Sequence, residues 1–204
     1  MANKDAAFGL RPVGNSSGAP YNGSVNKYYI NSTYATALFI GDPVVRNGTS
    51  NTTAVDGGRF SIGELPEVEK ATAGDGNAIT GVIVGFEPDF DNRSRLHNPA
   101  STERVVMVAD DPNLLCEIQA DGIVAVTEIG LNAVLIYANT GSTVTGLSGV
   151  ELDTSSDAPA ADASNQLTIV KYSNDAENND TTAANVNLMV RINNHSEAQG
   201  VIGL

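Results

Sequence analysis

The chain has 204 residues, with 11 Lys and Arg against 24 Asp and Glu, which gives a formal net charge of −13 at pH 7. This length suits one β domain of ordinary size or two small ones, and a hydrophobic fraction of 41% is enough to fill a core. Nucleic-acid binding needs clustered basic side chains that displace counterions from phosphates, so the charge excludes direct binding to DNA or RNA. We expect synthesis in a cytoplasm and no membrane partner, because no window has the apolar length of a signal peptide or a membrane span.

The first 24 residues are rich in Gly, Pro and small polar residues and contain few sizeable apolar side chains. Such a segment cannot form a core of its own. We expect either a frayed tail or an extended N-terminal arm whose apolar residues bind a neighbouring surface. Residues 25–204 are then expected to form a single β-rich domain.

From residue 25 onward, β-branched and aromatic residues are interrupted by Gly, Asp and Pro at short spacing, which is typical of a β-meander. The residues predicted as strands are 25–30, 37–40, 44–46, 78–86, 104–109, 115–119, 123–126, 167–170 and 186–192. Residues 131–137 fit a strand or a short helix. Residues 47–58 and 153–165 are small and polar and are predicted as loops, and Asp121-Gly122 is predicted as a two-residue hairpin turn.

No long segment has apolar residues at helical spacing, so little helix is expected. We therefore predict an all-β fold, an antiparallel β-sandwich or partly closed β-barrel with an extended N-terminal arm and long loops. Residues 105–109 are continuously apolar, which predicts burial on both faces, and the alternation in 186–192 predicts a half-buried strand. Cys116 lies in an apolar stretch and is predicted to be a buried, inert thiol.

Residues that could carry chemistry are few. His97 and His195 stand about a hundred residues apart in polar contexts without metal-ligand spacing, so both are predicted as surface or loop histidines. The glycine-rich pieces lack the lysine of a phosphate loop, and no nucleophile elbow occurs. We expect no enzyme activity, no cofactor and no metal site. The composition favours a structural or binding protein.

Two alternatives stay open. A carbohydrate-binding or adhesin-like β module would need a groove lined by exposed tyrosines, for which the candidates are Tyr28, Tyr29, Tyr34 and Tyr137. A hydrolase would need paired carboxylates, for which the candidates are Asp89, Asp91, Asp110 and Asp111.

Several segments of the chain carry a resemblance to a known family. They are MANKDAAFGLRPV at residues 1–13, GAPY at 18–21, YATALFIGDPV at 34–44, GVIVG at 81–85, VMVADDPN at 106–113 and VRINNH at 190–195. In these segments the chain resembles a group of small head proteins of tailed bacteriophages, particularly phages of aquatic bacteria.

The resemblance implies a capsid decoration, or cement, protein. Such a structural virion protein is made in the host cytoplasm and binds the outer surface of an expanded icosahedral head, commonly as a homotrimer. Its partners would be the major capsid protein and other copies of itself, and it would hold neighbouring capsomers against the pressure of packaged DNA. A charge of −13 agrees with an outer position, because the chain would be repelled from DNA.

The N-terminal arm is the segment expected to contact the capsid or a neighbouring subunit. The contact residues expected within it are Phe8, Leu10, Arg11, Pro12, Val13 and Tyr21. An extended arm of this kind binds through main-chain hydrogen bonds and a few apolar side chains. Deleting residues 1–13 is therefore expected to leave the β domain folded and to weaken its attachment to the head.

Overall fold

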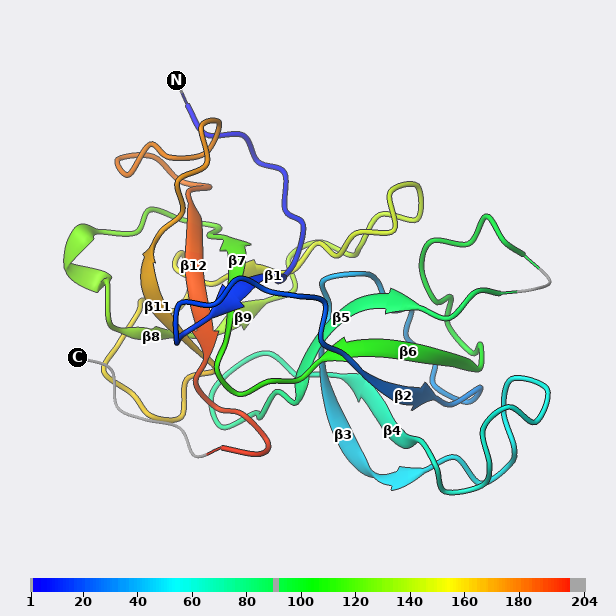
Figure 1. Ribbon diagram of the computed structural model, residues 1–204. Coiled ribbons are helices and arrows are strands. Elements are labelled where there is room, and N and C mark those ends of the chain that lie inside the picture. The colour runs from blue at the N-terminus through cyan, green and yellow to red at the C-terminus, as the bar shows by residue number, and fades with distance from the viewer. Residues whose placement is uncertain (1, 90–91, 199–204) are drawn as a thin grey trace.

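The computed structural model describes residues 2–89 and 92–198, and the prediction of an all-β fold is confirmed (Figure 1). Its strands are β1 (Arg11–Asn15), β2 (Asn26–Ile30), β3 (Pro43–Ser50), β4 (Pro66–Lys70), β5 (Gly81–Phe86), β6 (Arg104–Ala109), β7 (Leu114–Gln119), β8 (Asn132–Ala133), β9 (Leu135–Ile136), β10 (Glu151–Leu152), β11 (Leu167–Tyr172) and β12 (Asn187–Ile192). A short 3-10 turn, η1 (Val126–Glu128), lies between β7 and β8. Within the described ranges, no helix has the length and apolar character needed to cross a bilayer.

The strands form two main sheets. One closes into a barrel in the order β2-β4-β3-β5-β6, and the other is an open sheet in the order β1-β7-β12-β11-β8, with β9 and β10 paired separately. Pairing is antiparallel except between β2 and β4, where Tyr29 and Glu67 are parallel partners. Figure 1 shows the barrel at the right and the open sheet at the left. The architecture is thus a closed barrel beside an open sheet.

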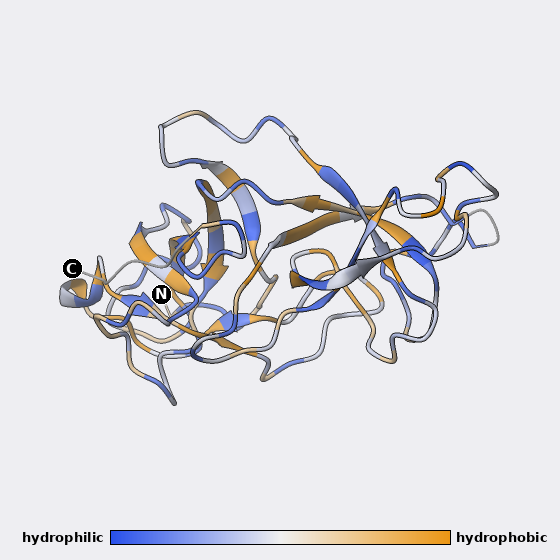
Figure 2. Ribbon diagram, turned by 90° about the horizontal axis from the view of Figure 1, so that it is seen from below, coloured by the Kyte–Doolittle hydropathy of each residue, from blue (hydrophilic) through white to orange (hydrophobic). Residues whose placement is uncertain are grey.

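The two sheets share their largest hydrophobic core. Ile118 and Leu188 contribute from the open sheet, Val82 and Ala109 from the barrel, and Leu10 from the N-terminal segment. A second cluster, including Ile30 and Val106, fills the barrel itself. Figure 2 shows hydrophobic stretches on several strands that run through the interior. Burial of apolar area at the barrel–sheet contact therefore stabilises both parts together.

Two of the burial predictions are confirmed. Within β6 every side chain is buried except that of Met107, which is half-buried, in agreement with the continuous apolar run. In β12, Met189 and Arg191 are half-buried and alternate with the fully buried Leu188, Val190 and Ile192. An inner strand that packs on both faces needs apolar residues at every position, whereas a strand with one wetter face does not.

Cys116 lies on β7 and is buried, as predicted. Burial raises the pKa of its thiol, because the thiolate would lose its hydration. A thiol-specific reagent is therefore expected to modify the native protein only as fast as the chain opens, and to react at once in denaturant. Absorbance of the released chromophore measures both rates. Complete modification of the native protein within seconds would contradict this prediction.

The N-terminal segment differs from the predicted extended arm, because it packs against its own chain. Strand β1 pairs with β7, with Arg11 opposite Glu117 and Pro12 opposite Cys116, and Leu10 is 1% exposed within the shared core. Residues before β1 also pack against the same chain: the Asn3 side-chain amide donates to the carbonyls of Asp180 and Ala184, both at 2.9 Å. Sequence composition could not show this pairing, because the partner strand lies a hundred residues away.

Some predicted strands are wrong. Residues 37–40 form only isolated bridges, from Leu38 to Asn98 and from Ile40 to Leu147. Residues 123–126 are not a strand, and Asp121-Gly122 is not a hairpin turn. The Asp121 carboxylate instead accepts hydrogen bonds from the backbone of Thr154 at 2.8 Å and Ser155 at 3.1 Å. The dipeptide therefore links the end of β7 to the loop that begins at Thr154. Strand β7 itself pairs with β1 and β12, and not with residues 123–126.

Other boundaries also shift. Strand β3 runs to Ser50, into the predicted loop, and its register shifts between Arg46 and Ser50. Strand β4 was missed by the prediction, because Val68 is its one fully buried residue and charged residues flank it. The stretch at 131–137 contains β8 and β9, so it forms strands and not a short helix.

Candidate functional site

The N-terminal segment meets the barrel at two glycines. The Leu10 amide donates to the Gly41 carbonyl at 2.9 Å, and the Gly41 amide donates to the Ile83 carbonyl at 2.8 Å. Gly9 and Gly41 have φ of 76° and 92°, and a Cβ on Gly41 would lie 2.6 Å from the Phe8 carbonyl oxygen. Glycine is required here both by the left-handed backbone and by the close approach of the two chains.

An apolar groove of about 220 Å³ lies along this contact. Its walls come from the N-terminal segment, from the turn before β3, from β5 and from the loop after β9. The lining residues are Phe8, Leu10, Arg11, Pro12, Ile40, Gly41, Ile83, Val84 and Leu147. Four of the six residues expected at a capsid or subunit contact are thus brought together. We call this site the junction groove.

The remaining two expected contact residues lie elsewhere. Tyr21 lines a separate polar cavity of about 260 Å³ that also includes Asp110 and Asp111. Val13 is half-buried within β1, and its carbonyl accepts a hydrogen bond from the Tyr21 amide at 3.2 Å. The structure therefore divides the predicted contact set between two sites.

Arg11 is the one charged residue among those that line the junction groove. Its guanidinium forms an ion pair with Glu117 and lies 4.7 Å from the centre of the Phe8 ring. Glu117 also accepts a hydrogen bond from the Ser173 hydroxyl. The charge of Arg11 is therefore balanced within the chain, and the groove presents a neutral, largely apolar surface.

Leu10 lines the groove and also belongs to the core. Replacing it by alanine is expected to lower the free energy of unfolding by about 3 kcal/mol, through lost burial and the cavity left behind. Urea unfolding followed by circular dichroism measures this change. The deletion of residues 1–13 is now expected to destabilise the domain itself, because it removes this side chain and part of β1. A deletion variant as stable as the whole chain would contradict the observed packing.

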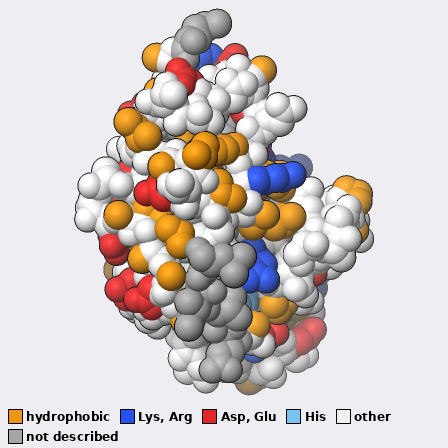
Figure 3. Space-filling model, turned by 90° about the vertical axis from the view of Figure 1, so that its left-hand side faces the viewer, with side chains coloured by type: hydrophobic (Ala, Val, Ile, Leu, Met, Phe, Trp, Pro, Cys, Tyr) orange, Lys and Arg blue, Asp and Glu red, His pale blue; other side chains and the backbone are white. Residues whose placement is uncertain are grey.

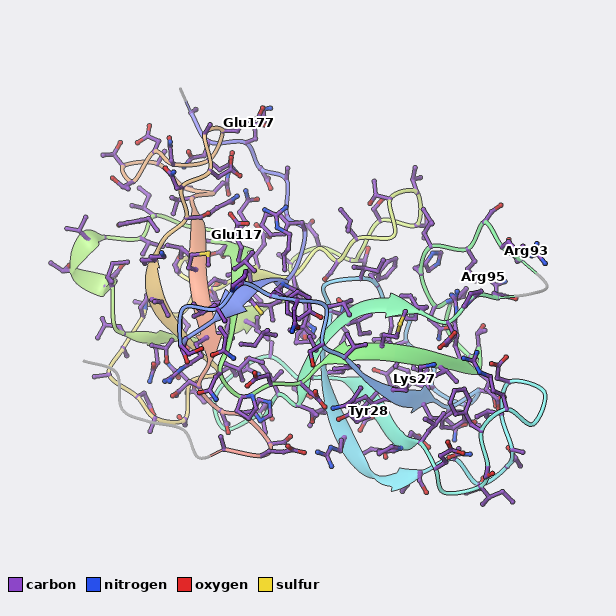
Figure 4. The ribbon with its side chains drawn as sticks, in the orientation of Figure 1. Lys27, Tyr28, Arg93, Arg95, Glu117 and Glu177 are labelled. Atoms are coloured by element: carbon purple, nitrogen blue, oxygen red, sulfur yellow. The ribbon has the colours of Figure 1, made fainter. Side chains whose placement is uncertain are left out.

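A cavity of about 410 Å³ lies at the far end of the barrel and is strongly charged. Its charged lining residues are Asp56, Glu87, Asp89, Arg95, Glu103 and Arg104. Figure 4 shows Lys27 and Arg95 at this end of the molecule. Asp91, a candidate for a hydrolase, lies outside the described residues, and Asp110 and Asp111 line the other polar cavity. Asp89 therefore lies in a different cavity from Asp110 and Asp111, so the structure does not bring these carboxylates together.

The charges in this cavity are compensated. Glu87 pairs with Lys27 and with Arg59 at 3.4 Å, and the hydrogen bond from Lys27 holds the pKa of Glu87 below its usual value. Asp89 pairs with Arg95 at 2.7 Å. The buried Arg104 guanidinium donates to the carbonyls of Glu87 at 3.0 Å and His97 at 2.9 Å. These contacts give the acidic cluster a structural role. In the described part of the chain, no group of three or more His, Cys, Asp or Glu side chains could hold a metal ion.

The four candidate sugar-binding tyrosines do not form an exposed platform. Tyr28 and Tyr29 are each 4% exposed and donate to Asp110 at 2.7 Å and to Glu103 at 2.9 Å. Burial, together with these acceptors, raises the pKa of both hydroxyls to about 12. Tyr34 and Tyr137 are half-buried, and their hydroxyls contact the backbone of residues 70 and 71. This burial counts against the alternative of a glycan groove.

Neither histidine is a freely exposed loop residue. His97 is half-buried and stacks on Phe39 with ring centres 5.0 Å apart, and His195 is 3% exposed. The His195 Nδ1 atom accepts a hydrogen bond from the Glu197 amide at 3.0 Å. The prediction of surface or loop histidines therefore holds for His97, which lies in a loop, and is wrong for His195, which is buried, because short polar neighbours in the sequence do not report packing by distant segments.

This burial gives the stability a pH dependence. Desolvation lowers the pKa of both histidines, and at His195 the backbone carbonyls of Thr80 and Asp110 partly offset the effect. The unfolded chain then binds more protons than the folded chain as the pH falls below about 6.5. We expect the free energy of unfolding to decrease from pH 7.5 to pH 5.5, and to decrease less in His195→Asn. Urea titrations at both pH values test this. An equal decrease in the free energy of unfolding for the wild-type chain and for His195→Asn would contradict this prediction.

The segments that carry the family resemblance lie close together in the fold. Residues 8–13 contact 34–44 and 81–85 along the junction groove. A Cβ on Gly81 would lie 2.4 Å from the Ala109 carbonyl oxygen, so 81–85 also packs tightly on 106–113. The Ile79 amide donates to the Asn194 carbonyl at 2.9 Å, so residues 190–195 lie beside the start of the 81–85 segment. These segments thus build the contact between barrel and sheet.

Sequence reasoning missed the walls of the groove that Ile40, Val84 and Leu147 provide. It also missed the loop at 139–149, whose one available signal is a run of residues without charge. Comparisons with protein-family models, with curated proteins and with solved structures find no match to this chain.

Proposed function

We propose that this chain is a capsid decoration protein, a structural virion protein that binds the outer surface of an icosahedral phage head and stabilises contacts between capsomers. The observation that carries the proposal is the position of the resembling segments. Residues 8, 10–12, 40–41 and 83–84 line one neutral, apolar groove on a chain with a net charge of −13. A neutral apolar surface on an otherwise acidic protein favours contact with other protein subunits.

Charge also supports an outer position. A subunit with 24 acidic and 11 basic residues would be repelled by packaged DNA, whereas the outside of the head exposes it to solvent. The shared core takes in Leu10, and β1 pairs with β7, so the N-terminal segment adds to the stability of the fold. This suits a protein that must persist outside a cell without a disulfide.

The test is co-sedimentation of the purified chain with expanded heads that lack decoration. Saturable binding at a fixed number of copies per capsomer is expected, and heads that are already decorated serve as the control. Binding that never saturates, or equal binding to decorated heads, would contradict the proposal. Retention on a glycan array together with no head binding would instead favour the carbohydrate-binding module.

A further inference from the structure

Two of the asparagines of this chain are followed by glycine, at Asn22-Gly23 and at Asn47-Gly48. The surface of the protein is largely polar: Figure 3 shows one face on which white polar side chains and backbone separate scattered hydrophobic and charged groups. Asn22 and Asn47 are both exposed. An Asn-Gly bond can rearrange without an enzyme, because glycine has no side chain to hinder attack of its amide nitrogen on the asparagine side chain. The two pairs are therefore candidate sites of spontaneous deamidation.

The two pairs have the same local geometry. Gly23 and Gly48 have φ of 84° and 86°, and a Cβ on either would point into open space. In each pair the asparagine Oδ1 atom accepts a hydrogen bond from the amide two residues later, Ser24 or Thr49, at 3.1 Å. This Asx turn folds the side-chain carbonyl over the following peptide and polarises it for attack. Sequence and local backbone therefore do not separate the two pairs.

Asn47 is held by its surroundings. It lies within β3, which pairs with β4 before and after it. Its Nδ2 atom donates to Glu67 Oε1 at 2.7 Å, and the Thr49 hydroxyl donates to its Oδ1 atom at 3.0 Å. Closure of a ring between the asparagine side chain and the next peptide requires both to rotate, so these hydrogen bonds must open first. The fold therefore slows the reaction at Asn47.

Asn22 is much less restrained. It lies in the loop between β1 and β2, where residues 22–24 are all exposed. Within residues 2–89 and 92–198, neither the Asn22 Nδ2 atom nor the Gly23 amide has a hydrogen-bond partner. The Tyr21 hydroxyl donates to the Ser24 carbonyl at 3.0 Å, which closes the loop but leaves the Asn22 amide group free to turn. The loop therefore permits the rotation that β3 opposes.

We infer that Asn22-Gly23 deamidates in the folded protein and that Asn47-Gly48 is protected. The Gly23 amide nitrogen loses its proton to hydroxide and attacks the Asn22 Cγ atom, and the side-chain nitrogen takes up a proton and leaves as ammonia. Water then opens the resulting succinimide at either carbonyl, which leaves aspartate or isoaspartate at position 22. Overall, one water is consumed and one ammonia is released. The inference does not rest on the proposed function.

Deamidation changes the charge of the polar cavity that Asn22 lines. Asn22 and Ser24 share this cavity with Asp110 and Asp111. Among the described residues these two carboxylates form no ion pair, and neutral donors such as the Tyr28 hydroxyl, at 2.7 Å from Asp110, bond to them. Replacing the Asn22 amide by a carboxylate adds one negative charge to the net −13 and places a third carboxylate at the cavity. The native chain thus undergoes a slow, irreversible change of charge at this point.

The experiment is peptide mass mapping of the purified chain after increasing times at pH 8. Fragmentation locates, at each asparagine, the mass gain that accompanies replacement of NH₂ by OH. We expect Asn22 to react at least about tenfold faster than Asn47, because Asn47 must first break its hydrogen bonds to Glu67 and Thr49. Equal rates at the two asparagines of the folded chain, or a faster reaction at Asn47, would overturn the inference.

Two controls show whether the fold causes the difference. In urea at the same pH, the two pairs are expected to react at similar rates, because each is Asn-Gly followed by a hydroxyl residue. Glu67→Ala removes the acceptor of the Asn47 amide and is expected to speed the reaction at Asn47 several-fold, whereas Glu69→Ala, on the same strand, is expected to leave it unchanged. A tenfold difference that persists in urea, or an unchanged Asn47 rate in folded Glu67→Ala, would contradict the inference.

Discussion

Replacing Lys70 by methionine is expected to lower the free energy of unfolding by about 3 to 5 kcal/mol, because it leaves a buried carboxylate without its partner. The Lys70 ammonium lies 3.0 Å from Asp42 Oδ1, and the Asp42 side chain is 0% exposed. The same carboxylate accepts hydrogen bonds from the Ser148 hydroxyl at 2.6 Å and from the Phe39 amide at 2.8 Å. Urea unfolding followed by fluorescence or circular dichroism measures the loss.

Two variants make this prediction specific. Lys4 pairs with Glu177 at the surface, where the two side chains are 65% and 68% exposed, so Lys4→Met is expected to change stability by less than about 1 kcal/mol. Adding Asp42→Asn to Lys70→Met is expected to recover part of the loss, because the buried charge is then removed. Equal effects of Lys4→Met and Lys70→Met would contradict the account of the buried pair.

Replacing Gln166 by leucine is expected to cost about 4 kcal/mol, although the two side chains are similar in size. Gln166 is fully buried and contacts four backbone groups: its Oε1 atom accepts from Gly74 at 3.0 Å and Leu135 at 3.2 Å, and its Nε2 atom donates to Thr72 at 2.8 Å and Asn77 at 3.1 Å. Leu135 is buried and Gly74 and Asn77 are half-buried, whereas Thr72 is exposed. Each backbone group left unpaired away from water costs about 1 to 3 kcal/mol, and partial relaxation reduces the sum.

The matched control is Gln119→Leu. Gln119 is also fully buried, and its two shortest bonds go to the backbone of the exposed residues Lys4 and Ala6, both at 2.9 Å, with longer ones to the Asn185 carbonyl at 3.3 Å and to Asn187 Oδ1 at 3.4 Å. Water can replace the two short bonds, so the expected loss is about 1 to 2 kcal/mol. Chemical denaturation of both variants gives the comparison. A larger loss for Gln119→Leu than for Gln166→Leu would contradict this ranking.

The parts of the fold that could be predicted from the sequence are those in which one segment determines its own environment. The continuous apolar run in β6 and the alternation in β12 directly reflect burial on two faces or one. Strand β4 escaped prediction because its charged residues are compatible with a barrel strand only once the neighbouring strands cover Val68. Asp121-Gly122 has the composition of a hairpin turn, but its carboxylate bonds to a loop that begins at Thr154.

The candidate site could likewise be predicted only in the part that a single segment of the sequence determines. Phe8, Leu10, Arg11 and Pro12 could be selected from the sequence, because they are the larger residues of a segment rich in small ones. Their opposite wall, with Ile40, Val84 and Leu147, depends on long-range pairing that no local pattern reports. Whether the N-terminal segment extends from the domain or packs on it depends on β7, which lies a hundred residues later.

The most direct test of the proposed function is the stoichiometry of binding to expanded, undecorated heads. The proposal predicts saturation at a fixed number of copies per capsomer, with no binding to heads that are already decorated. Heads that sediment without the chain, at concentrations where the chain is folded and assembled, would contradict the proposal that it is a capsid decoration protein.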